Sequence, residues 1–111
     1  MEFTGCGIQR IPTNVSGNFI EIELYYSKGG LNVFTYMQEQ RGYYVSVRPI
    51  TVERNFVSFV VFSGKKMLVH QCGRKSPKAE REAVHNANEC RDLIERLVRE
   101  IARKNNLEVE V

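Results

Sequence analysis

The fold is decided by the stretch NFIEIELY, residues 18–25, in which apolar and polar side chains alternate. The even-numbered positions from Ile20 to Leu24 are aliphatic, whereas the odd-numbered positions from Glu21 to Tyr25 hold glutamate and tyrosine. Successive side chains of a β-strand point to opposite faces, so this period of two is typical of a strand with one face in a core. The stretch therefore predicts a sheet strand with one aliphatic and one more polar face.

Strand patterns continue from this stretch as far as Cys72. The further strands that we expect are Leu31–Met37, Tyr43–Ile50, Phe56–Phe62 and Lys66–Cys72. The triplet Lys28-Gly29-Gly30 predicts a hairpin turn, because adjacent glycines supply the positive φ angles of tight turns. Pro49 cannot donate a ladder hydrogen bond and marks an edge or a strand end. These signals together predict an antiparallel meander of four to five strands.

The two ends of the chain carry weaker patterns. Residues 1–17 are rich in glycine and polar turn formers, so we expect a loop or a loosely attached arm that can include a short strand near Gly7–Ile11. Residues 18–111 are expected to form a single domain. The tail Leu107–Val111 alternates apolar and acidic residues, which is compatible with one more short strand.

One long amphipathic helix follows the strands. Ser76 can accept hydrogen bonds from the first free N–H groups, and Pro77 fits the first helical position. Apolar residues then recur every three or four positions up to Asn105-Asn106, where asparagine tolerates a left-handed cap. The sequence therefore predicts an α+β domain with a helix from about Pro77 to Asn105 packed on one sheet face.

A single helix can cover only one face of the sheet, although both faces carry apolar or aromatic side chains. The more aliphatic face is expected beneath the helix, and it holds Ile20, Ile22, Leu24, Val33, Val45, Val47, Phe59 and Val61. The opposite face, which includes Tyr25, must then stay open, pair with a second copy of the chain, or bind another molecule. We take this second face as the expected functional surface.

Positive charge is concentrated on the strands and turns. The formal net charge is +3, and the stretch Lys28–Lys75 holds eight basic and two acidic residues, against seven and six in Lys78–Lys104. Aromatic rings among cations suit single-stranded nucleic acid, because bases stack on rings and cations attract phosphates. The predicted nucleic-acid-binding residues are Lys28, Phe34, Tyr36, Tyr44, Arg48, Lys65, Lys66, Arg74 and Lys75.

The aromatic face has two other interpretations. In the first, it closes over a different protein, and the chain is a binding module such as an inhibitor of a host defence nuclease. In the second, the aromatic rings complete the core of a homodimer, and the functional surface lies elsewhere. A homodimer is also expected in the nucleic-acid interpretation.

The sequence holds no motif for catalysis, a cofactor or a metal. It has no CxxC or HxxxH pair, and His85 and Cys90, five positions apart on the helix, would lie about 140° apart around its axis. No glycine-rich phosphate loop precedes a helix. We therefore expect a protein that is not an enzyme and that binds neither a cofactor nor a metal.

Cysteine usage and hydropathy indicate the compartment. Three widely spaced cysteines, Cys6, Cys72 and Cys90, do not look like a disulfide framework, which favours a reducing cytoplasm. The start of the chain shows no signal-peptide pattern, and no apolar run approaches the roughly 18–20 residues that cross a bilayer. We expect a cytoplasmic protein with no membrane partner.

Three segments carry a resemblance to known proteins. They are KGGLNVFT (residues 28–35), RGYYVSVRP (41–49) and SFVVFSG (58–64). Over roughly residues 20–85 the chain resembles small proteins of unknown function carried by bacteriophages and conjugative elements. The resemblance implies a mobile-element accessory protein and brings no catalytic residues with it.

The order of elements carries a second resemblance. Strands followed by one helix are similar in architecture to the single-stranded-DNA-binding fold of the positive-cofactor-four and Whirly proteins. In that fold, two copies pack through their helices and present β surfaces to nucleic acid. The resemblance implies a dimer with a nucleic-acid-binding sheet face, and function does not follow from fold alone.

Overall fold

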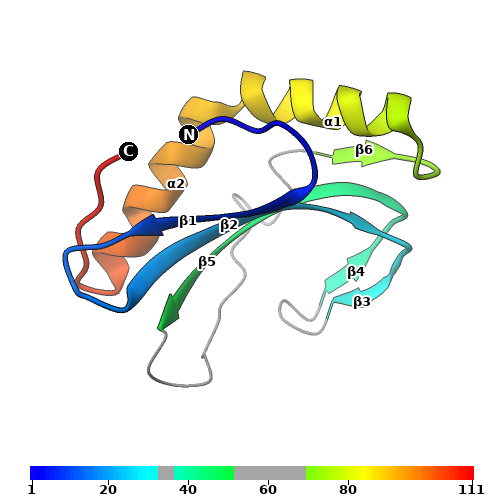
Figure 1. Cartoon of the computed structure of the whole chain (residues 1–111). Coiled ribbons are helices and arrows are strands. Elements are labelled where there is room, and N and C mark those ends of the chain that lie inside the picture. The colour runs from blue at the N-terminus through cyan, green and yellow to red at the C-terminus, as the bar shows by residue number, and fades with distance from the viewer. Residues whose placement is uncertain (33–36, 52–69) are drawn as a thin grey trace.

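The computed structural model of the chain describes residues 1–32, 37–51 and 70–111. Within these ranges the strands are β1 (Gly7–Pro12), β2 (Asn18–Ser27), β3 (Gly30–Asn32), β4 (Met37–Glu39), β5 (Gly42–Thr51) and β6 (His70–Cys72). The helices are α1 (Pro77–Glu89) and α2 (Arg91–Lys104). Both helices lie on one side of the main sheet (Figure 1). The predicted α+β class with an antiparallel sheet is therefore confirmed.

The main sheet has the strand order β1-β2-β5-β6, and every pairing is antiparallel. The two ten-residue strands β2 and β5 form its centre, with Ile22 opposite Val47. The predicted strand Phe56–Phe62 lies outside the described residues. Of the predicted strand Lys66–Cys72, the described part is β6.

Strands β2 to β5 form one long hairpin with a bend in it. Two residues on each side, Lys28-Gly29 and Gln40-Arg41, separate the β2–β5 ladder from the β3–β4 ladder, so the register continues without a shift. Gly29 and Gly30 have φ angles of +93° and +111°, which residues with a Cβ atom rarely adopt. The prediction of a hairpin turn at Lys28-Gly29-Gly30 was wrong. The glycines bend the strand instead. Of the predicted strand Leu31–Met37, Leu31 and Asn32 belong to β3 and Met37 to β4, and residues 33–36 lie outside the described residues.

The helices cover the aliphatic face of the sheet, as predicted. The buried cluster on this side joins strand residues to helix residues, and its strand members include Ile20, Ile22, Leu24, Val45 and Val47. Ala83 and Ala87 of α1 are fully buried, and their small side chains allow close approach to the strands. Val33, Phe59 and Val61, which were also expected here, lie outside the described residues.

The single long helix that we predicted is two helices. α1 ends at Glu89 and α2 begins at Arg91, with Cys90 outside helical geometry at φ −95° and ψ 10°. One straight helix of this length would extend about 40 Å. The break allows α1 to contact β5 and β6 while α2 contacts β2 and β5. Both predicted ends are confirmed, because the Ser76 side chain accepts from the Ala79 N–H at 3.0 Å and Asn106 is left-handed at φ 57°.

The N-terminal residues are part of the domain rather than a loosely attached arm. β1 pairs with β2 along its whole length, which confirms the short strand near Gly7–Ile11. Ahead of it, Phe3 is buried in the core. The Asn88 side chain of α1 accepts from the Phe3 N–H and donates to the Phe3 carbonyl, both at 2.9 Å. In the tail, the structure has a single bridge between Thr13 and Val109.

The second sheet face is shielded around its centre within one chain. Tyr44 and Ser46 of β5 are buried, and so is Glu21 of β2. Tyr25 lies directly opposite Tyr44, which confirms that these tyrosines share a face. We expected this face to stay open, pair with a second copy of the chain or bind another molecule. That expectation was wrong at Tyr44, Ser46 and Glu21, which are buried within a single chain.

Neither α1 nor α2 is long and apolar enough to cross a membrane, and they are the helices of the described ranges.

Candidate functional site

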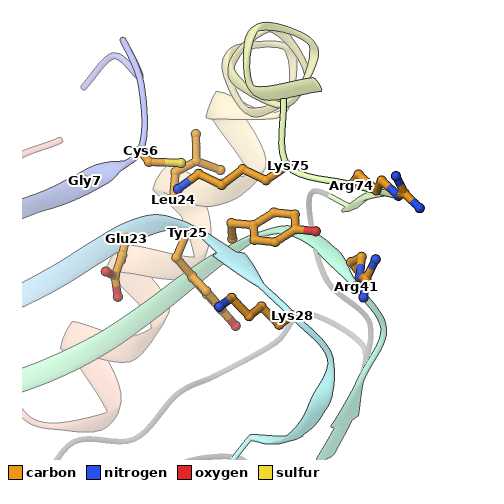
Figure 2. Close-up of a pocket in the computed structure, with 10 residues that line it drawn as sticks. Cys6, Gly7, Glu23, Leu24, Tyr25, Lys28, Arg41, Arg74 and Lys75 are labelled. Atoms are coloured by element: carbon orange, nitrogen blue, oxygen red, sulfur yellow. The ribbon is translucent and has the colours of Figure 1, made fainter. Parts of the chain in front are cut away.

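An open pocket of about 640 Å³ lies where the N-terminal segment, the end of β2 and the chain ahead of α1 meet (Figure 2). Four of its lining residues are basic. The described lining residues are Cys6, Gly7, Glu23, Leu24, Tyr25, Tyr26, Lys28, Arg41, Arg74 and Lys75. We call this feature the cationic pocket.

The sheet register brings the basic residues together from distant parts of the sequence. Gly42 lies opposite both Ser27 and Cys72, so the end of β2, the start of β5 and the end of β6 are neighbours. The Gly73 N–H donates to the Arg41 carbonyl at 3.2 Å, which places Arg41 next to the residue that precedes Arg74. Gly73 has a φ of +120° and turns the chain from β6 towards α1.

Positive charge dominates the cationic pocket. Lys28, Arg41, Arg74 and Lys75 are exposed, and in the described ranges none of them forms a salt bridge. The one carboxylate among the described lining residues is Glu23. Burial raises the pKa of Glu23 above its ordinary value, although Arg48 acts in the opposite direction. Four basic groups against one carboxylate make this pocket attractive to anions.

Two tyrosine rings form part of the wall, and both are held in place. Tyr26 packs edge-on against Tyr43 at 5.0 Å between ring centroids, and its hydroxyl donates to the Gly73 carbonyl at 2.9 Å. Tyr25 stacks against Tyr44 at 5.9 Å, and its hydroxyl donates to the Glu39 carboxylate. The pocket therefore combines fixed, partly exposed aromatic surface with flexible cationic side chains.

The Cys6 thiol lies on the side of the pocket that the N-terminal segment forms. Figure 2 shows Lys75 extending from the chain ahead of α1 towards Cys6, with Arg41 and Arg74 on the side away from it. Burial of the sulfur raises the pKa of Cys6 to about 11, and the hydrogen bond with Glu80 acts in the same direction. The thiol is therefore protonated at neutral pH and adds no negative charge to the pocket.

Arg48 lies apart from the cationic pocket, on the second sheet face. Arg10, Glu21 and Arg48 are directly opposite one another across β1, β2 and β5. The Arg48 Nε donates to Glu21 Oε1 at 2.6 Å, a second Arg48 nitrogen contacts the same oxygen, and Arg10 Nε lies 3.3 Å from Oε2. The buried carboxylate therefore already balances part of the charge that we assigned to phosphate binding.

The structure brings together three of the predicted nucleic-acid-binding residues, Lys28, Arg74 and Lys75. Tyr44 is only 3% exposed, and its hydroxyl donates to the Gln40 carbonyl at 2.6 Å, so its ring offers no platform for a base. The prediction for Tyr44 was therefore wrong. Phe34, Tyr36, Lys65 and Lys66 lie outside the described residues.

Sequence reasoning missed Arg41, Glu23 and Tyr26 as site residues. Arg41 stood in the basic stretch, but nothing local shows that it lies beside the segment that holds Arg74. Tyr26 follows the last residue of the alternating stretch, so the pattern did not decide on which face of the strand its side chain lies. Gly42, directly after Arg41, was a sequence signal for the start of a strand. That strand pairs with the end of β2, which holds Tyr26, and with β6.

In the described part of the chain, no three His, Cys, Asp or Glu side chains gather in a way that could hold a metal ion.

No protein-family model, curated protein or solved structure matches the chain. The two resemblances drawn from the sequence therefore stay predictions, and the cationic pocket is the feature from which we infer a function.

Proposed function

We propose that this chain is a non-enzymatic protein that binds single-stranded nucleic acid through the cationic pocket. The observation that carries the proposal is the set of four basic side chains, Lys28, Arg41, Arg74 and Lys75, around one pocket with partly exposed tyrosines. The resemblance to mobile-element proteins supplies the setting, that of a phage or mobile-element accessory protein.

The chemistry of the pocket suits a strand with unpaired bases. Lysine and arginine that neutralise phosphates release condensed counterions, which drives association at low salt. An unpaired base can stack on an aromatic ring, which contributes roughly 1–3 kcal/mol per base. Tyr25 and Tyr26 supply the aromatic surface beside the cations. A duplex keeps its bases stacked inside and would gain only the phosphate contacts.

The test is fluorescence anisotropy with a labelled single-stranded oligonucleotide over a range of salt concentrations. Four phosphate contacts predict that the logarithm of the association constant falls against the logarithm of salt with a slope of about −3. Lys28→Gln and Arg74→Gln should each weaken binding about tenfold, the contribution of one charge-assisted hydrogen bond. The matched control is Arg99→Gln, which removes an exposed arginine of α2 outside the pocket.

Absence of binding even at low salt would refute the proposal and favour the rival interpretation, a protein-binding module. Equal affinities for Arg74→Gln and Arg99→Gln would show that the strand binds elsewhere. Light scattering of the same samples measures the oligomeric state, for which the sequence predicts a homodimer.

A further inference from the structure

In the described part of the chain, the basic residues outside the cationic pocket are accompanied by acidic ones. Among the described basic residues outside it, Arg10 and Arg48 contact Glu21, and Lys104 pairs with Glu100 at 3.3 Å. Along α1 and α2 basic and acidic residues are mixed, with seven against six between Lys78 and Lys104. The interior of a nucleic-acid strand carries single phosphate charges spaced along its length, whereas this pocket holds four basic side chains in one place.

The two arginines lie at neighbouring ends of paired strands, because Arg41 directly precedes β5 and Arg74 follows the end of β6 by two residues. The hydrogen bond from Gly73 to the Arg41 carbonyl joins the start of β5 to the residue before Arg74. Figure 2 shows Arg41 and Arg74 at the same side of the pocket. A guanidinium group has five N–H donors in a planar fork that matches the oxygens of a phosphate. Two such forks present four paired N–H donors, whereas a phosphodiester has only two non-bridging oxygens to accept them.

A phosphate monoester matches this arrangement better than a phosphodiester. It carries a charge of about −1.5 to −2 at pH 7 and three strong acceptor oxygens. Among the lining residues that the structure describes, one carboxylate, Glu23, stands against four basic side chains, which leaves enough positive charge for a dianion. Lys28 and Lys75 remain to contact the next phosphate of a strand or the rest of a nucleotide.

The geometry points to a terminal phosphate monoester as the group that the cationic pocket binds, with Arg41 and Arg74 as its principal donors. This inference rests on the proposed function and deepens it, because it makes the end of a strand the preferred target. A free nucleotide presents the same monoester, so the experiment must separate the two sources.

The experiment compares labelled single strands of one sequence that end in a 5′-hydroxyl, a 5′-phosphate or a 3′-phosphate. Anisotropy titrations should show that at least one phosphorylated strand binds about tenfold more tightly than the hydroxyl strand, the value of one charge-assisted hydrogen bond. Arg74→Lys keeps the charge but loses the fork, so it should lose most of this preference while it still binds the hydroxyl strand. Arg99→Gln should keep the preference, and circular dichroism confirms that each variant is folded.

Equal affinities for all three strands would overturn the inference and leave the proposed function standing. If no strand binds, the proposed function fails, and calorimetry with a nucleoside 5′-monophosphate decides the rest. Binding of that nucleotide, lost in Arg74→Gln, would support the monoester with a free nucleotide as its source. No binding of the nucleotide would overturn both.

Discussion

Replacing Glu21 by glutamine should destabilise the fold by more than any surface charge change. The Glu21 side chain is only 3% exposed, and the Arg48 and Arg10 side chains that contact it are 19% and 54% exposed. Glutamine keeps the shape of the side chain and removes its charge. The change therefore removes the Glu21 charge that lies against the largely buried Arg48 cation.

The magnitude follows from these exposures. Breaking a buried ion pair from one side costs about 3–5 kcal/mol, whereas an exposed pair contributes about 0–1 kcal/mol. Because one fifth of the Arg48 side chain still reaches solvent, we expect a loss of about 3 kcal/mol from Arg48 and little from Arg10. For a domain of this size, about 4 °C per kcal/mol predicts a melting temperature about 12 °C lower.

The assay is urea unfolding followed by circular dichroism, with Glu110→Gln as a matched control on the exposed tail. Arg10→Gln should change the free energy of unfolding by less than about 1 kcal/mol. A double-mutant cycle of Glu21→Gln with Arg48→Gln should show strong coupling, because the two side chains are in direct contact. A loss below about 1 kcal/mol for Glu21→Gln, at an unchanged m-value, would refute the reasoning.

Three further predictions concern other parts of the molecule. Asn88→Ala removes both hydrogen bonds to the Phe3 backbone and should lower the free energy of unfolding by about 1–3 kcal/mol in the same urea assay; an unchanged value would show that the N-terminal segment is held by packing alone. Ser76→Ala removes the hydroxyl that accepts from the Ala79 N–H and should cost about 1 kcal/mol, while Ser76→Asp should restore stability if capping is the cause. Because burial raises the pKa of Glu23, the fold favours its protonated form, and stability should fall as pH rises above the ordinary value of 4.5 and through the raised pKa. Glu23→Gln should remove this loss in unfolding measurements across pH and should tighten oligonucleotide binding at neutral pH; weaker binding would contradict the assigned role of the pocket charge.

Local patterns were sufficient to predict the main elements. The alternation in residues 18–25 predicted both β2 and its aliphatic face, and Ser76 with Pro77 predicted the start of α1. Such signals depend on side chains a few positions apart, so they can be interpreted without knowledge of distant partners. The same holds for Asn106, whose left-handed conformation lets the chain that follows α2 donate to carbonyl groups in its last turn.

Contacts between distant residues determined the rest. Gly29 and Gly30 suit a turn or a bend equally well, and the unbroken register with Gln40 and Arg41 made them a bend. The helix break at Cys90 follows the layout of the strands beneath it rather than a proline or glycine.

The candidate site depends most on tertiary structure. Lys28 and Arg74 are basic residues on separate turns in the sequence, and the cross-strand pairing at Gly42 makes them neighbours in one pocket. The alternation of side chains places Tyr44 on the face that we expected to be exposed, but the folded chain buries it. Periodicity assigns a side chain to a face of a strand, whereas exposure depends on what the remainder of the chain places over that face.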